Sequence, residues 1–204
     1  MSIRRGEAWG ESGPLPADGI VAATNAEVRD AVERAMRDRF DLPAIGLLGG
    51  DLCTTLGGRG NRDRLSSDSG SRTLVDVGRV FLDETAEHWF VAHLVARRSW
   101  WHGRVLAVMN AAWIGAWNVA PRAHPGDGAF DVIDANPSFG DRWKARRRLP
   151  SGTHVPHPAI GVHRARLFEV DLGRSMSIRL DGVEVGRARR LRIAVLPDAL
   201  AVVV

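Results

Sequence analysis

Cysteine, lysine and long apolar segments are scarce in this chain. Cys53 is the single cysteine, which excludes an intramolecular disulfide and a zinc cluster built on cysteines. No apolar run approaches the roughly 20 residues that a membrane-spanning helix requires. The first five residues carry charge but lack the apolar segment of a secretory signal. Together these absences predict an intracellular, cytoplasmic protein.

Positive charge is carried almost entirely by arginine. Lys144 is the one lysine among 28 basic residues, and the net charge is +4. Arginine presents a planar fork that matches phosphate, although a biased codon usage explains the same excess. This net positive charge suits an anionic membrane surface, a phosphorylated ligand or nucleic acid as a binding partner.

Several tryptophans lie near runs of basic residues in the sequence. Because Trp100 and Trp101 are neighbours, we expect one of them to be exposed or the pair to line a pocket.

The first 60 residues predict a β-α-β unit. A short buried strand at 20–23 leads into a capping box formed by Thr24 and Glu27. Apolar residues then recur at helical spacing, which predicts an amphipathic helix that ends before Pro43. The residues on its apolar face are Val28, Val32, Ala35, Met36 and Phe40. A second strand at 44–48 ends in the turn Gly49-Gly50.

The rest of the chain predicts a β-rich unit. Residues 61–72 are rich in glycine, serine and charge, and are predicted to be a linker. Strand patterns follow at 73–82, 88–96, 104–110, 129–134, 162–170, 176–180, 183–186 and 191–204, with one helix at about 138–149. The predicted fold class is therefore α+β: a partial α/β layer in residues 1–60 and an antiparallel β-rich domain in residues 73–204.

Several short motifs of the C-terminal half occur in a characteristic order. They are Asn118-Val119-Ala120-Pro121, Asp127-Gly128-Ala129-Phe130-Asp131, Gly152-Thr153-His154, Leu180-Asp181-Gly182 and Val195-Leu196-Pro197. Read together, they resemble the C-terminal domain of the diacylglycerol kinase and sphingosine kinase family of lipid kinases. The resemblance implies that Asp181 is the base that takes the proton from a lipid hydroxyl. It implies a structural role for the acidic pair Asp127 and Asp131. On spacing alone, Asp181-Gly182 is a hairpin-turn signal, so both interpretations stay open.

The N-terminal half resembles the same family less closely. Gly49, Gly50 and Asp51 resemble a shortened ligand loop, which implies that all three bind a phosphate or nucleotide and that Asp51 is catalytic. The glycine pair alone indicates only a tight turn. The family's Gly-Gly-Asp-Gly-Thr loop is replaced by Ala23-Thr24-Asn25-Ala26-Glu27, which places a carboxylate where a nucleotide phosphate would lie.

Three functions are consistent with these patterns. The first is a degenerate, truncated relative of the lipid kinases that binds an anionic lipid or a phosphorylated small molecule, with weak or no kinase activity alone. The second is an active lipid kinase that uses Mg-ATP, alone or with a second copy or a partner chain that supplies the nucleotide half. The third is a basic protein that binds membranes or nucleic acid, of which nucleic acid is the less favoured. No metal site is expected, and peripheral attachment to the inner face of the membrane would fit the tryptophans and arginines.

Overall fold

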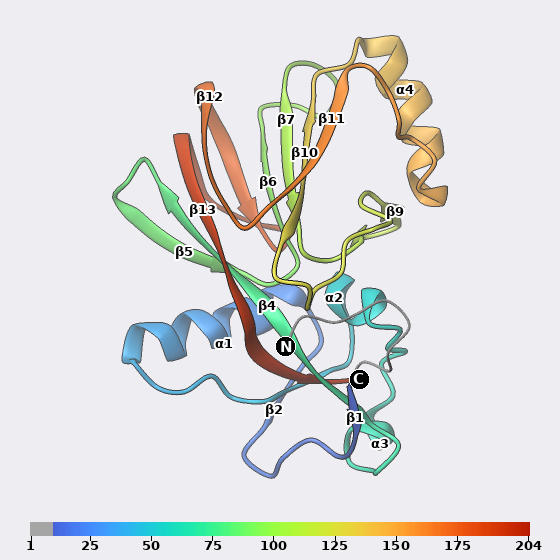
Figure 1. Cartoon of the computed structure of the whole chain (residues 1–204), viewed down its shortest axis with the longest axis vertical. Coiled ribbons are helices and arrows are strands. Elements are labelled where there is room, and N and C mark those ends of the chain that lie inside the picture. Colours follow the sequence, from blue (N-terminus) through green and yellow to red (C-terminus); the bar gives the residue numbers. More distant parts are fainter. Residues whose placement is uncertain (1–9) are drawn as a thin grey trace.

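Residues 10–204 are described by the structure, a computed structural model (Figure 1). The elements of the N-terminal part are β1 Glu11–Ser12, β2 Ile20–Ala22, α1 Asn25–Asp38, β3 Ile45–Leu47, α2 Gly50–Thr55 and α3 Arg62–Leu65. Those of the remainder are β4 Ser71–Leu82, β5 Ala86–Phe90, β6 His93–Arg97, β7 Val105–Met109, β8 Trp113–Ile114, β9 Trp117–Asn118, β10 Phe130–Ala135, α4 Phe139–Arg148, the 3-10 helix η1 Leu149–Ser151, β11 Ile160–Ala165, β12 Leu167–Leu180 and β13 Val183–Val203. The predicted α+β class is confirmed.

One sheet connects the two parts of the chain. Its main order is β1-β4-β13-β12-β6-β7-β10-β11, and every neighbouring pair along it is antiparallel. β2 and β3 are parallel, and β3 joins the C-terminal end of β13 in parallel through Val202 and Ile45. The long strands β4 and β13 run from the antiparallel part down to the α/β layer, as Figure 1 shows.

Helix α1 begins and packs largely as its sequence predicts. The Thr24 side chain accepts a hydrogen bond from the Glu27 backbone N–H at 3.2 Å, and the apolar face is buried at Val28, Val32 and Ala35. Phe40 is an exception, because its side chain is 73% exposed. The helix ends at Asp38 and Arg39 takes a left-handed conformation, so Phe40 no longer lies on the helical face.

Some predicted boundaries are wrong for reasons of long-range packing. The predicted strand 88–96 is two strands, β5 and β6, because the chain turns at residues 91–92. The predicted strand 162–170 likewise divides into β11 and β12, while 183–186 and 191–204 belong to the single strand β13. The predicted linker contains α3, whose Leu65 is buried. The predicted buried strand at 20–23 is an edge strand in which Ile20 and Val21 are exposed. Part of the lead-in expected at residues 1–17 lies outside the described residues.

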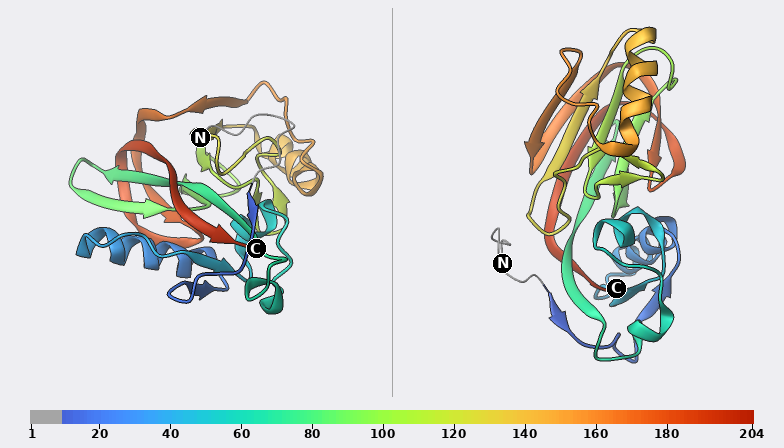
Figure 2. Two further views of the ribbon diagram at one scale, coloured as in Figure 1. Left: turned by 60° about the horizontal axis from the view of Figure 1, so that its bottom comes forward. Right: turned by 90° about the vertical axis from the view of Figure 1, so that its right-hand side faces the viewer.

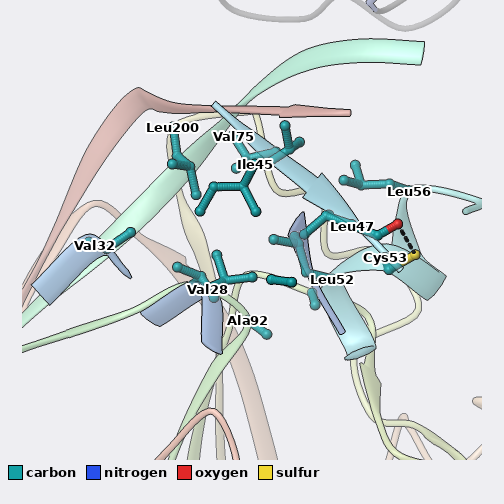
Figure 3. Close-up of a cluster of buried hydrophobic side chains, with 14 of the residues drawn as sticks. Val28, Val32, Ile45, Leu47, Leu52, Cys53, Leu56, Val75, Ala92 and Leu200 are labelled. Atoms are coloured by element: carbon teal, nitrogen blue, oxygen red, sulfur yellow. Dashed lines mark hydrogen bonds between the residues drawn. The ribbon is translucent and has the colours of Figure 1, made fainter. Parts of the chain in front are cut away.

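The core forms in separate clusters. One lies between α1, α2, β3 and the lower ends of β4 and β13, and includes Val28, Ile45, Leu52 and Leu200 (Figure 3). A second fills the curved antiparallel sheet, where the predicted alternation in β12 is confirmed by buried Met176, Ile178 and Leu180. A third, smaller cluster lies near α4, which covers one face of the sheet (Figures 1 and 2). Among the described residues, no helix is both long and apolar enough to cross a membrane.

Candidate functional site

Polar side chains meet where the α/β layer faces the loops of the antiparallel sheet. The parallel strands β2 and β3 end here, and α1 and α2 start here. Ligands of open α/β sheets bind outside the carboxyl ends of parallel strands. The facing loops come from residues 91–93, 110–115 and the turn between β12 and β13. A ligand site of this α/β layer would therefore lie at this junction.

Asp51 is the centre of a hydrogen-bonded group at this junction. Its Oδ2 atom lies 2.9 Å from Nε2 of His93 and accepts a hydrogen bond from Nδ2 of Asn25 at 3.0 Å. Its Oδ1 atom accepts the Gly115 backbone N–H at 2.7 Å. The His93 side chain is 3% exposed and that of Asp51 is 17% exposed. The sequence interpretation missed His93, because nothing within its own segment marks it.

Asp181 faces the interior of the protein. Its Oδ2 atom accepts the backbone N–H of Val91 at 2.9 Å, and its Oδ1 atom accepts those of Ala92 and His93 at 2.8 and 3.1 Å. The side chain is buried. Burial raises the pKa of this carboxyl, against the opposing effects of His93 and the three N–H groups. These bonds also explain why the chain turns between β5 and β6.

Asp181 and Gly182 form the turn of the β12–β13 hairpin. Leu180 pairs with Val183 across it, and the φ angles of the two turn residues are +51° and +87°. Positive φ at both central positions is what a two-residue type I′ turn requires. The hairpin interpretation is therefore confirmed, whereas a role for Asp181 as a catalytic base stays a prediction.

The predicted phosphate loop is packed closely against the start of α1. A Cβ atom on Gly49 would lie 2.5 Å from the Ala23 carbonyl oxygen, and one on Gly50 would lie 2.4 Å from Oδ1 of Asn25. That same Asn25 oxygen accepts the Leu52 backbone N–H at 3.2 Å. Glycine is therefore required at 49 and 50 for close packing, and phosphate binding by Gly49, Gly50 and Asp51 stays a prediction.

The acidic pair lies elsewhere, at the end of β10. Asp127 and Asp131 both pair with Arg164 of β11, and the distance from Nε of Arg164 to Oδ1 of Asp131 is 3.7 Å. Burial raises the pKa of Asp131. A third acidic residue near this end, Asp76 of β4, was not singled out from the sequence, yet it is fully buried and accepts the Gly128 backbone N–H at 2.7 Å. The described residues include no group of three or more metal-ligating side chains.

An apolar cavity of about 120 Å³ lies under α4. Its wall is formed by side chains of β7, β10, β11 and α4, and by three tryptophans: Trp100, Trp101 and Trp117. Both members of the predicted tryptophan pair therefore line a pocket, and Trp101 is 43% exposed at its edge. The guanidinium of Arg146 lies 5.1 Å from the Trp101 ring and 4.9 Å from the Trp117 ring.

His154, the histidine of the Gly-x-His motif, also lines this cavity. Its side chain is 6% exposed, and burial lowers its pKa, although a hydrogen bond with the Val119 backbone acts in the opposite direction. A histidine whose pKa is lowered by burial is neutral at physiological pH. The cavity therefore has a mostly apolar wall that includes one uncharged imidazole; of the two arginines in its lining, Arg142 is buried and Arg146 is exposed.

Comparisons with known proteins agree with this architecture. The fold is similar to solved structures described as a putative diacylglycerol kinase from Bacillus anthracis str. Sterne. One match has a TM-score of 0.70 at 11% identity and covers 91% of this chain and 77% of the other. A second has a TM-score of 0.59 at 11% identity and covers 79% and 69%. The fold is thus like that of these putative diacylglycerol kinases, in agreement with the resemblance in the sequence motifs.

The sequence comparison identifies the family. Residues 86–204 match the YegS C-terminal NAD kinase beta sandwich-like domain, and the chain belongs to that family. No curated protein matches the sequence.

Proposed function

We propose that this protein binds an anionic phospholipid or another phosphorylated amphiphile, with weak or no phosphoryl transfer by the chain alone. The observation that carries the proposal is the apolar cavity under α4, with Arg146 at its rim. An apolar cavity excludes water and gains free energy when an apolar group enters it. A cation beside the opening then favours an apolar ligand with a negatively charged head group.

The size of the cavity limits what enters it. An apolar cavity of about 150 Å³ in another protein takes up benzene, and the cavity here measures about 120 Å³. It therefore suits a ring or a short stretch of acyl chain. The rest of a long lipid would extend out of the cavity beside Trp101, at the exposed edge, and remain outside the protein.

Weak or absent kinase activity is supported by the junction between the two parts. The backbone N–H groups of Leu52 and Gly115 at this junction already donate to Asn25 and Asp51, so neither is free to bind a phosphate. Glu27 accepts the Ala23 N–H at 2.6 Å. Its carboxylate would repel a nucleotide triphosphate at the start of α1.

The lipid proposal is tested with a soluble probe. Dihexanoyl phosphatidylglycerol, kept below its micelle concentration, is titrated while tryptophan fluorescence is followed, because three tryptophans line the cavity. Saturable binding is expected, with weaker binding of dihexanoyl phosphatidylcholine. Glycerol phosphate, the head group alone, is expected to produce no change. If it binds as well as the lipid, the protein recognises phosphate and the cavity is not its site.

A matched pair of variants locates the binding. Ala107→Phe places a ring into the cavity wall, whereas Ala86→Phe makes the same change at an exposed position of β5. We expect Ala107→Phe to abolish lipid binding and Ala86→Phe to leave it unchanged. Equal binding by both variants contradicts the proposal.

The active-kinase alternative is tested separately. Calorimetric titration with Mg-ATP is expected to show no saturable binding at millimolar nucleotide. Saturable binding, followed by phosphate transfer to a lipid hydroxyl, would replace the proposal with the kinase. If transfer then appears only in the presence of a second protein, a partner supplies the nucleotide half. In either case Asp51→Asn and Asp181→Asn would show which carboxylate takes part.

A further inference from the structure

The outer face of α4 combines exposed aromatic rings with unpaired positive charge. Phe139 is 66% exposed and Trp143 is 52% exposed, and they stand four residues apart on the helix, which places them on one face. The half-exposed Trp101 adds to them, because its ring centroid lies 6.1 Å from that of Phe139. We call this region the α4 surface. It comprises Trp101, Phe139, Trp143, Lys144, Arg146, Arg147 and Arg148.

The charge of α4 differs from that of the rest of the protein. Five basic residues and one acidic residue give the helix a net charge of +4, which equals the net charge of the whole chain. Elsewhere several arginines pair with carboxylates, among them Arg104 with Asp134 at 2.7 Å and Arg189 with Asp171 at 3.2 Å.

On the α4 surface, two of the three arginines contact tryptophan rings. Within residues 10–204, the only ion pair formed by this surface is Lys144 with Asp141 at 3.3 Å. The Arg147 guanidinium lies 4.9 Å from the Trp143 ring, and Arg146 lies against Trp101 and Trp117. Contact with an aromatic ring leaves the positive charge of the guanidinium uncompensated.

We infer that the α4 surface docks on an anionic lipid bilayer. Tryptophan and phenylalanine enter the interfacial region of a membrane, and lysine and arginine beside them attract anionic head groups. Nucleic acid would use the same charges but does not require two bulky apolar rings exposed together on one face. Single exposed apolar side chains are ordinary, whereas a group of them among cations marks an interaction site.

This surface adjoins the cavity. Trp101 and Arg146 belong both to the α4 surface and to the cavity wall. A docked protein would therefore hold the cavity next to the lipids from which it takes a chain. This consequence rests on the proposed lipid-binding function, whereas docking itself does not.

The test is sedimentation of the protein with lipid vesicles. Vesicles of phosphatidylcholine alone are compared with vesicles that also contain phosphatidylglycerol. The intact protein is expected to bind the anionic vesicles more tightly and to lose affinity as salt is added. Each basic residue near an anionic surface contributes about fivefold. Arg147→Gln with Arg148→Gln should therefore weaken binding by about 25-fold.

The control makes the same change of charge elsewhere. Arg190→Gln with Arg192→Gln alters two exposed arginines of β13 that pair with Glu84 and Glu169, and it should change affinity by less than about threefold. Phe139→Ser with Trp143→Ser keeps every charge and should weaken vesicle binding by at least about tenfold. All of these positions are exposed, so the variants should fold, which urea unfolding verifies.

Three outcomes would overturn the inference. The first is an equal loss of vesicle affinity in the Arg147/Arg148 variant and the Arg190/Arg192 variant, because net charge alone would then explain the effect. The second is full vesicle binding by the Phe139 and Trp143 variant. The third is tighter binding of duplex DNA than of vesicles, unaffected by loss of the two rings. Ala107→Phe separates the two proposals, since it should lose the soluble lipid and keep vesicle binding. If the intact protein binds the soluble lipid but does not bind anionic vesicles, the cavity proposal stands and the docking surface is rejected.

Discussion

Replacement of Asp181 by glycine tests whether this residue is a structural anchor. The carboxylate accepts the backbone N–H groups of Val91, Ala92 and His93, all in the interior. Glycine tolerates the positive φ of this position, so Asp181→Gly removes the acceptors without adding backbone strain.

The expected cost follows from the three N–H groups that lose their partner. A buried donor left unsatisfied costs about 1–3 kcal/mol. The change also removes a carboxylate whose desolvation disfavours the fold, and the loop can relax. We therefore expect the free energy of unfolding to fall by about 3–5 kcal/mol, the range found when one partner of a buried charged interaction is removed.

Asp83 provides a matched control. It also has a positive φ, +48°, and its Oδ1 atom accepts the N–H groups of Arg189 and Arg190 at 3.0 and 2.7 Å. Asp83 is exposed, so water can replace its carboxylate. Asp83→Gly should therefore cost less than about 1 kcal/mol.

Urea unfolding followed by tryptophan fluorescence measures both changes, with the midpoint and slope fitted separately. If Asp181→Gly is no more costly than Asp83→Gly, the anchoring role is refuted and the carboxylate is free for chemistry.

Two further changes test the cavity and the sheet. Burial lowers the pKa of His154 below its ordinary 6.5, so the unfolded state binds a proton before the folded state does as the pH falls, and the protein loses stability. His154→Gln should reduce this loss of stability between about pH 7.5 and 5.5. If the variant shows the same pH dependence of urea unfolding, the lowered pKa of His154 is contradicted. In β4, a Cβ atom on Gly78 would lie 2.2 Å from the buried ring of Phe90. Gly78→Ala should therefore lower the free energy of unfolding by about 1–3 kcal/mol. Gly140→Ala, which adds a methyl group in α4 with nothing within 4 Å, should leave the free energy of urea unfolding unchanged or raise it.

Local sequence determined the features that depend on neighbouring residues. The Thr24 cap, the buried face of α1, the period-two pattern of β12 and the Asp181-Gly182 turn all follow from side chains within a few positions of one another. The order of motifs in the C-terminal half was also sufficient to indicate the family. Exposure at the ends of elements was harder to predict, as Phe40 shows, because a single left-handed residue redirects the chain.

Only the tertiary structure decided which of these elements meet. His93 pairs with Asp51 from 42 positions away, and Asp181 binds N–H groups 88 to 90 positions away. The cavity likewise forms from the tryptophans, three strands of the sheet and α4. Strand order and register place these groups together, and both are set by the summed burial of many side chains. The sequence by itself therefore determined which residues carry charge, rings and turns. The fold decided that one carboxylate points inward to anchor a loop, and that Phe139, Trp143 and three of the four arginines of α4 are exposed.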